Sequence, residues 1–568
     1  MRTDQPKPAA ESAALLVPGF AGLAALAALW TVLQVGTRLA DGHWGSTAHL
    51  VDLLTGAAEW TPWHTAAAVA VGLLFVAMGV WATVVVVKRR TAVKHVDRKA
   101  GAMGDPAGLS KAAAVRRATE GRMYREGTDP GLMFGQSVST GQDLWSYWRD
   151  GMVIEMGPGS GKTTGIAVPL IVDAPGVVVA TSNKRDLADA VRATCAARGT
   201  CWVFDPQRIN NYHGARPAWW WNPLEQIHGP VEANALARVF ADASAPADAS
   251  KHSYFDNAGP ALLGNLILAA ACGGHQLDQV YLWVADPSAT DREAVPLLKA
   301  NGFTLPAAAL KGACKAAPDE RSGLFGTAAA AVAFLTSPEI LAWVTDAEGR
   351  PQFDPDKFVT SGHDTLISLS REGVGTAGPL TTALTVAVMT AAERMAQRHA
   401  HGRLPVPLVA VLDEVANVCR WSGLPGQFSH YGSAGIFLVA ILQNWAQGVG
   451  AWKPSGMQQM WDAATIRLVG AGIADRQHLG DVAQFIGETY KPRRTAGTST
   501  GDRFSRSVNT SFDRELILSV DELAGLPAGR MIVLPAGGYP ILGRTVPWFR
   551  RPAMTGQVTA SIAANEPK

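Results

Sequence analysis

The sequence predicts an α/β fold with a mostly parallel sheet, and three observations carry this prediction. Short apolar segments alternate with helical segments from residue 144 onward, the pattern of parallel strands joined by helices. A glycine-rich stretch ending in Gly161-Lys162-Thr163 follows the first of these segments. A later apolar run ends in the acidic pair Asp413-Glu414. Together they indicate a P-loop nucleoside triphosphatase (NTPase).

The N-terminal part, residues 1–90, is expected to form a transmembrane hairpin. It contains two uncharged apolar segments, at about 13–35 and 65–87. Each is long enough for the ~20 residues that cross a bilayer as a helix. A cleaved signal peptide is the alternative for the first segment, and the second segment disfavours it.

The charges around these segments predict their orientation. Six basic residues follow the second segment between Lys88 and Lys99, whereas the connector at 36–64 has Arg38 against three acids, Asp41, Asp52 and Glu59. The positive-inside rule then places both termini in the cytoplasm. We therefore expect a multi-pass protein of the inner (cytoplasmic) membrane with its NTPase domain in the cytoplasm.

The next segment, residues 91–140, shows weak periodicity and is expected to be a juxtamembrane linker. Residues 141–229 are expected to form the first part of the NTPase core. Its expected elements are a strand near 151–156, a helix at 162–172, a strand at 177–182, a helix at 186–198 and a strand at 201–205.

The glycine-rich stretch between the first strand and helix is the predicted nucleotide-binding loop, with Gly157, Pro158, Gly159, Ser160, Gly161, Lys162, Thr163 and Thr164. Glycines let backbone N–H groups close around a phosphate, and the helix N-terminus adds a favourable dipole. Lys162 would reach the β- and γ-phosphates and the Thr163 hydroxyl would hold Mg²⁺. Met156 stands where the general pattern has a glycine, and a chance Gly-Lys-Thr in a loop is the alternative.

The remaining chain divides by composition. Residues 230–350 are rich in Ala and Leu and are expected to form an all-α insertion. The core resumes as its second part, 351–550, and residues 551–568 are expected to be a C-terminal tail. The expected strands lie at 365–369, 408–413, 436–442 and 465–469, with a closing hairpin at 530–546.

The acidic pair would supply the two carboxylate groups that the glycine-rich loop does not contain. Five apolar residues precede Asp413, as in a strand buried on both faces, and the carboxyl edge of such a sheet is where α/β folds bind ligands. Asp413 would hold Mg²⁺ through water, and Glu414 would polarise the attacking water. The alternative is a strand ending in solvated acids. Gln443 ends the strand at 436–442 and would read the γ-phosphate, or alternatively only cap that strand.

Composition limits the other possibilities. The net charge is +2, so a nucleic-acid contact must be local, and the five cysteines show no metal-ligand spacing. Residues 491–514 are polar and basic and are expected to be a flexible loop, with a DNA-touching arm as the alternative. For Trp219-Trp220-Trp221 we favour core packing over base stacking.

These parts together resemble the TraG/TraD-like coupling proteins of conjugation and type IV secretion, over about residues 10–550. The stretches that carry the resemblance are Thr181-Ser182-Asn183-Lys184-Arg185-Asp186-Leu187, Phe204-Asp205-Pro206, Trp221-Asn222-Pro223-Leu224, Leu412-Asp413-Glu414-Val415-Ala416-Asn417 with Gly423-Leu424-Pro425, Ile441-Leu442-Gln443-Asn444-Trp445-Ala446-Gln447 and Leu523-Ala524-Gly525-Leu526-Pro527.

The resemblance implies a RecA-like motor that uses ATP and Mg²⁺ and assembles as a homohexamer. It also implies the partners: relaxase-bound single-stranded DNA, relaxosome proteins and components of a type IV secretion channel. One departure is Ala434, where relatives often carry an arginine finger; Arg371, Arg420 or Arg467 would then substitute. A protein-exporting membrane ATPase, a double-strand pump of the FtsK type and a docking receptor with weak hydrolysis are the alternatives.

Overall fold

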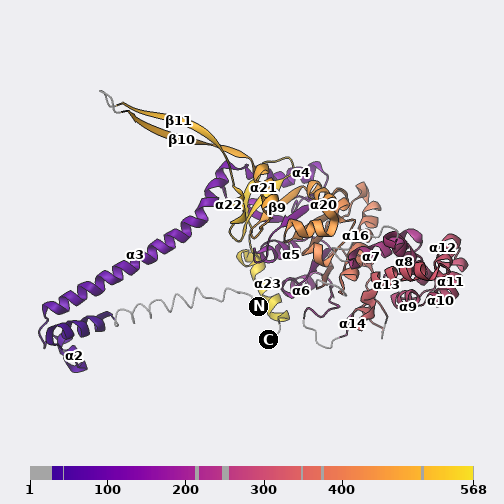
Figure 1. Ribbon diagram of the computed structural model, residues 1–568, viewed down its shortest axis with the longest axis horizontal. Coiled ribbons are helices and arrows are strands. Elements are labelled where there is room, and N and C mark those ends of the chain that lie inside the picture. The colour runs from indigo at the N-terminus through magenta and orange to yellow at the C-terminus, as the bar shows by residue number, and fades with distance from the viewer. Residues whose placement is uncertain are drawn as a thin grey trace. The chain divides into compact units, whose positions relative to one another are not determined.

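The computed structural model describes residues 28–42, 44–123, 125–210, 216–245, 255–346, 349–371, 376–499 and 505–566. The chain forms two compact units, Met1–His95 and Val96–Lys568. The first unit contains α2 (Thr47–Thr55) and most of α3 (Pro62–Lys99), which continues into the second unit (Figure 1).

Only part of the two expected membrane spans lies within the described residues. The span at 65–87 falls within α3, whereas residues 13–27 of the other lie outside the described part of the chain. Among the helices of the described residues, none combines the length and the apolar character needed to cross a bilayer.

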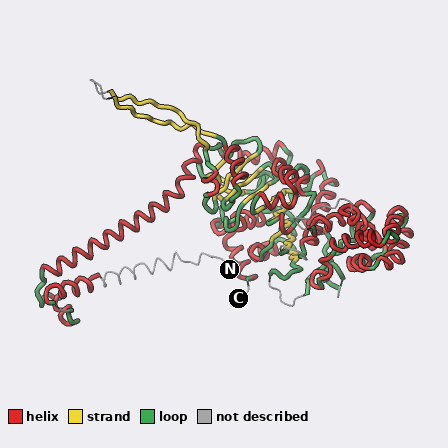
Figure 2. Tube along the Cα trace, viewed as in Figure 1, coloured by secondary structure: helices red, strands yellow, loops and turns green. Residues whose placement is uncertain are grey.

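The second unit is built around one large sheet, whose strands are yellow in Figure 2. The strand order is β2-β1-β13-β12-β9-β3-β8-β7-β4-β6-β5. The strands from β9 to β5 in this order are parallel, and the other four continue the sheet in antiparallel fashion. The mostly parallel sheet predicted from the sequence is therefore confirmed. The strands span Met133–Ser137 (β1), Asp143–Trp145 (β2), Met152–Glu155 (β3), Val178–Ser182 (β4), Cys201–Phe204 (β5), Thr365–Leu369 (β6), Leu408–Leu412 (β7), Ile436–Leu442 (β8), Ile466–Gly470 (β9), Arg530–Pro535 (β12) and Ile541–Arg544 (β13).

Helices cover both faces of the sheet, which is why β7 and β8 are apolar throughout. In β7, Val409 and Val411 face one hydrophobic core, and the alternate residues Leu408, Ala410 and Leu412 face the other. The first core includes α5 (Val168–Val172), α6 (Arg185–Ala196) and α23 (Pro552–Asn565). The second includes α16 (Gly378–Gln397), α20 (Trp445–Ala463) and α21 (Arg476–Ile486).

Between β5 and β6 the chain forms a group of helices, seen together in Figure 1. The described residues of 230–350 contain no strand. The helices are α7 (Pro230–Ser244), α8 (Phe255–Cys272), α9 (Leu277–Ala285), α10 (Pro287–Ala289), α11 (Val295–Ala300), α12 (Thr304–Cys314), α13 (Pro318–Ala331) and α14 (Pro338–Leu341).

The tryptophan triplet packs in the core, as favoured from the sequence. Trp219, Trp220 and Trp221 are 4%, 7% and 3% exposed. The ring of Trp219 contacts those of Trp202 and Trp343 at centroid distances of 5.5 and 5.0 Å. The triplet therefore joins the edge strand β5 to the helical insertion.

Three segments are more ordered than the sequence predicts. The linker segment contains α4 (Lys111–Glu120) and β1, which pairs with β13. The described residues of 491–514 are not a loop: β10 (Glu488–Ser499) and β11 (Ser505–Leu516) form a separate two-stranded antiparallel ribbon, and residues 500–504 lie outside the described part of the chain. The expected tail holds α23, where Ser561 Oγ donates to Asp189 O on α6 at 2.7 Å. Pairing with distant residues orders β1 and α23, and local periodicity does not report such contacts.

The end of α3 is fastened to the sheet by ion pairs. The Arg530 guanidinium donates two hydrogen bonds of 2.9 Å to the Asp97 carboxylate, and Lys99 Nζ lies 2.7 Å from Glu522. The N–H of Gly529, next to Arg530, donates to Ser160 O at 3.2 Å. The loop 527–530 thus contacts both the end of α3 and the glycine-rich loop.

Candidate nucleotide-binding site

The glycine-rich loop leaves the sheet at its centre. β3 ends at Glu155 between the parallel strands β8 and β9, and the loop leads into a π-helical turn, Thr163–Ala167, that continues as α5. Gly159 and Gly161 adopt φ of +71° and +87°, a left-handed conformation that favours glycine. Such a turn directs successive backbone N–H groups toward one point, where they can bind an anion.

Gly157 permits the loop to pass close to the end of β9. A Cβ atom on Gly157 would lie 2.2 Å from the carbonyl oxygen of Gly472, and the Gly157 N–H donates to Ala471 O at 2.9 Å. The glycine one step out of phase with the general pattern is therefore required by packing. Gly472, itself at φ +85°, was not singled out from the sequence, although the Gly-Ala-Gly run at 470–472 was a signal of close approach.

We expect Gly157→Ala to lower the melting temperature and weaken nucleotide binding, because the added methyl group must displace backbone. The cost of such overpacking is about 1–3 kcal/mol. Gly480→Ala is the matched control, since Gly480 lies in α21 with open space around its Cβ position. Thermal unfolding of both variants checks this, and equal melting temperatures would contradict it.

Lys162, Glu414 and Gln443 meet at the carboxyl edge of the sheet, as the sequence predicts. Lys162 Nζ lies 2.5 Å from Glu414 Oε1, and the Gln443 side-chain amide donates to the same oxygen at 2.7 Å. The Lys162 and Glu414 side chains are only 11% and 2% exposed. A buried cation and a buried anion thus lie in direct contact and neutralise each other.

Glu414 is held in a strained backbone conformation. Its φ and ψ are 53° and 39°, in the left-handed region that glutamate rarely adopts. It stands between β7 and the short helix α17 (Val415–Val418), and the sharp turn directs its side chain toward Lys162. Strain of this kind costs about 1–3 kcal/mol and is concentrated at functional sites.

Asp413 is buried beside this pair, and its environment raises its pKa to about 7. Burial is the main cause, and the negative charges of Glu414 and Asp186 add to it, while Lys162 opposes it. The Thr181 hydroxyl donates to Asp413 O at 3.0 Å and fixes this strand end against β4. Near neutral pH, Asp413 therefore binds and releases a proton readily.

This pKa predicts how stability changes with pH. Between about pH 4 and 7 folded Asp413 retains a proton that the unfolded chain releases, so the stability of the nucleotide-free protein falls as pH rises through this window. In Asp413→Asn this contribution is absent. The melting temperature of the variant minus that of the wild-type protein should therefore increase from pH 5 to pH 7. A difference that stays constant over this range would contradict the assignment.

The residues fit a magnesium–triphosphate group. Ser160 Oγ and Glu414 Oε2 are buried and have no hydrogen-bond partner in the described part of the chain. These polar atoms can therefore form hydrogen bonds with a bound ligand or its water. Thr163 and Asp413 supply the hydroxyl and carboxylate oxygens that Mg²⁺ prefers. Within the described residues no three His, Cys, Asp or Glu side chains form a metal cluster, and Mg²⁺ commonly completes its shell with phosphate oxygens and water.

A buried glutamate–histidine contact behind the loop was missed from the sequence. Glu155, the last residue of β3, is fully buried, and its carboxylate lies 2.7 Å from His478 Nε2 on α21. Burial raises the pKa of Glu155, and His478 opposes the shift. The His478 ring stacks on Trp445 at 4.6 Å, two residues after Gln443. No spacing rule connects residues 155 and 478.

The arginines considered as substitutes for a finger occupy three different places. The Arg467 guanidinium lies over the ring of Phe485 at 5.3 Å, and Arg420 donates to Ala416 O at 3.0 Å. Arg371 is exposed at the end of β6. Ala434 is buried at the end of α19 (Tyr431–Ala434).

A lysine-bearing glycine loop and an acidic pair at one edge of a parallel sheet mark a candidate nucleotide-binding site in a protein of the α/β class. Similar proteins narrow this class. Residues 407–528 match the family model described as the TraM recognition site of TraD and TraG. The predicted resemblance to TraG/TraD-like coupling proteins is therefore confirmed.

Solved structures of conjugative coupling proteins are similar to this chain in fold. The unbound monoclinic form of the bacterial conjugative coupling protein TrwBdeltaN70 is 18% identical, with 76% of this chain and 91% of that chain covered and a TM-score of 0.51. Plasmid coupling protein TrwB with ADP and Mg²⁺ is 16% identical, with coverages of 77% and 94% and a TM-score of 0.52. Its complex with the non-hydrolysable GTP analogue GDPNP is 17% identical, with coverages of 75% and 91% and a TM-score of 0.50. No curated protein sequence matches the chain significantly.

Proposed function

We propose that this protein is a membrane-anchored coupling ATPase that brings relaxase-bound single-stranded DNA to a type IV secretion channel and drives its translocation. The observation that carries the proposal is the meeting of Lys162, Glu414 and Gln443 at the glycine-rich loop. The match of residues 407–528 to the TraD and TraG model supports the conjugative role. Complexes of TrwB with ADP and Mg²⁺ and with an ATP analogue support ATP and Mg²⁺ as the cofactors.

The geometry supports a mechanism in which Lys162 changes partner. A bound triphosphate attracts Lys162 away from Glu414, and bound Mg²⁺ would neutralise developing phosphate charge beside Thr163 and Asp413. Glu414 then keeps the hydrogen bond from Gln443 and is free to accept a proton from the attacking water. In this mechanism Glu414 is the base and Lys162 the phosphate-binding cation.

Gln443 is positioned to pass the state of the site to α20. Its side chain contacts Glu414, its backbone N–H donates to Gln447 Oε1 at 3.2 Å, and Asn444 caps the N-terminus of α20. A change at Glu414 is therefore transmitted to α20 through a single residue, Gln443. Movement of α20 is the coupling step of the proposed motor.

The proposed assembly follows the resemblance. Residues 1–90 anchor the protein in the cytoplasmic membrane, the NTPase faces the cytoplasm, and a homohexameric ring contacts relaxosome proteins through residues 407–528. The apolar segments at 13–35 and 65–87 and the basic residues behind them support the anchor.

An ATPase assay on the purified full-length protein, with and without single-stranded DNA, tests the proposal, together with the mass of the assembled particle. We expect Mg²⁺-dependent hydrolysis that single strands stimulate and a particle of six subunits. Hydrolysis indifferent to DNA would favour a protein-exporting ATPase.

A docking receptor with weak hydrolysis is the second candidate, because Ala434 stands where relatives often carry an arginine. In the same assay this candidate would bind single strands without turning over ATP.

A further inference from the structure

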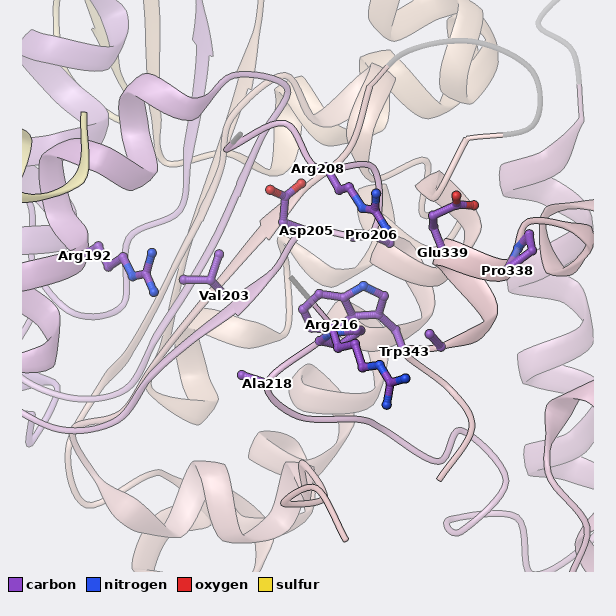
Figure 3. Close-up of a pocket in the computed structure, with 12 residues that line it drawn as sticks. Arg192, Val203, Asp205, Pro206, Arg208, Arg216, Ala218, Pro338, Glu339 and Trp343 are labelled. Carbon is purple, nitrogen blue, oxygen red and sulfur yellow. The ribbon is translucent and has the colours of Figure 1, made fainter. Parts of the chain in front are cut away.

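A cavity of about 360 Å³ lies at the carboxyl end of the edge strand β5, several strands away from the glycine-rich loop (Figure 3). It is formed by α6, the segment that follows β5, the segment before the tryptophan triplet and the end of the helical insertion. The lining residues are Arg192, Val203, Asp205, Pro206, Arg208, Arg216, Pro217, Ala218, Pro338, Glu339, Ala342 and Trp343.

The charged groups of the cavity are mostly cationic. Arginines reach it from three separate segments: Arg192 from α6, Arg208 from the turn after β5, and Arg216 from the segment before the tryptophan triplet. Of the two acids, Asp205 is buried and its carboxylate already accepts the backbone N–H groups of Ile209 and Asn210, each at 2.8 Å. The other acid, Glu339, is exposed. Hydrogen bonds from its own backbone N–H and from Ser337 lower the pKa of its carboxyl, and the charge of Arg208 adds to this shift. The cavity is therefore electropositive and suits an anion.

Arg208 is held in a conformation that arginine rarely adopts. Its φ is +54°, and the turn is closed by its own N–H, which donates to Asp205 O at 3.2 Å, and by the two bonds to the Asp205 carboxylate. Arg208 is thus an exposed residue with a strained backbone, at a position where glycine would adopt the same φ without strain. The Phe204-Asp205-Pro206 stretch, which the nucleotide site does not use, builds this turn.

The rest of the lining is apolar and contains several rings. Trp343 is 7% exposed, and its indole is fixed by edge-on contacts with Phe204 and Trp219 at 4.9 and 5.0 Å. Pro206, Pro217 and Pro338 add further rigid apolar surface. An aromatic ring beside guanidinium groups is a combination that binds single-stranded nucleic acid, since bases stack on aromatic side chains and phosphates bind arginines; here Trp343 is the aromatic member.

We propose that this cavity binds one nucleotide unit of a single-stranded DNA segment, with Arg208 on a phosphate and the base against the apolar lining. The inference rests on the proposed function and adds a place on the molecule where the strand is held. An acidic polypeptide could also bind Arg208, but it would leave the apolar lining beside Trp343 without a planar partner.

The test is Arg208→Gly in the full-length protein, because glycine removes the guanidinium and relieves the left-handed strain. The probe is fluorescein-labelled oligo(dT) of 30 nucleotides, measured by fluorescence anisotropy at several salt concentrations. We expect at least a fivefold loss of affinity, a slope of log K against log[salt] reduced by about 0.7, and a melting temperature that is unchanged or higher. Basal ATP hydrolysis should stay at the wild-type level.

The matched control is Arg476→Gln. Arg476 is 83% exposed in α21. This helix follows β9, which lies on the opposite side of β3 from β5 in the strand order. It should bind oligo(dT) like the wild-type protein. Wild-type affinity in Arg208→Gly would overturn the inference and leave the proposed function standing. Poly-glutamate serves as a second probe. If Arg208→Gly loses binding to poly-glutamate but keeps binding to oligo(dT), the cavity binds acidic protein instead of DNA. Absence of oligo(dT) binding by the wild-type protein would overturn the proposed function itself.

Discussion

Glu414→Gln is expected to bind ATP as the wild-type protein does and to hydrolyse it about 10²–10⁴-fold more slowly. The amide keeps the size of the carboxylate and can still meet Gln443, but it cannot accept a proton from water. Because Glu414 Oε1 is the oxygen that both Lys162 and Gln443 contact, the substitution removes the base at the centre of the cluster.

Two measurements separate these effects: the affinity for a fluorescent ATP analogue and the steady-state rate of phosphate release. Glu232→Gln, at an exposed position in the first turn of α7, is the matched control and should change neither. Wild-type turnover in Glu414→Gln would refute the assignment of the base.

Lys162→Met is expected to abolish tight nucleotide binding and also to destabilise the nucleotide-free protein. The methionine retains the apolar stem but leaves the Glu414 carboxylate, 2% exposed, without its cation. Breaking a buried ion pair from one side costs about 3 kcal/mol or more, because the remaining charge stays buried and uncompensated.

The double variant Lys162→Met/Glu414→Gln tests this explanation, since it removes both charges. Its melting temperature should recover toward the wild-type value while nucleotide binding stays lost. Lys357→Met is the control, because Lys357 is 86% exposed and its pair with Asp354 is a surface one. A double variant no more stable than Lys162→Met would show that the two groups do not form a coupled pair.

The sequence predicted the parts of the site that depend on strand ends. β6 and β8 coincide with the predicted ranges 365–369 and 436–442, and the apolar run before Asp413 is β7. Lys162, Glu414 and Gln443 follow three different parallel strands, and the carboxyl ends of such strands share one edge. Their meeting was therefore predictable although 252 residues separate Lys162 from Glu414.

The parts that the sequence did not predict depend on contacts between distant residues. The left-handed backbone of Glu414 follows from the turn between β7 and α17, and glutamate itself gives no sign of it. His478 pairs with Glu155 because α21 crosses the end of β3. The four antiparallel strands at one side of the sheet were also incomplete in the prediction, since β1 falls in a segment without clear alternation. In each case tertiary packing overrides local propensity.

The position of β3 between β8 and β9 has a consequence for biosynthesis. Both neighbours of β3 are encoded about 280 or more residues downstream, so a ribosome adding about 5–20 residues per second reaches them only after tens of seconds. Until then the nascent segment that carries the glycine-rich loop has no strand beside it and cannot bind nucleotide. Its apolar residues must be shielded by chaperones or by the growing chain, so this segment is exposed to aggregation during translation.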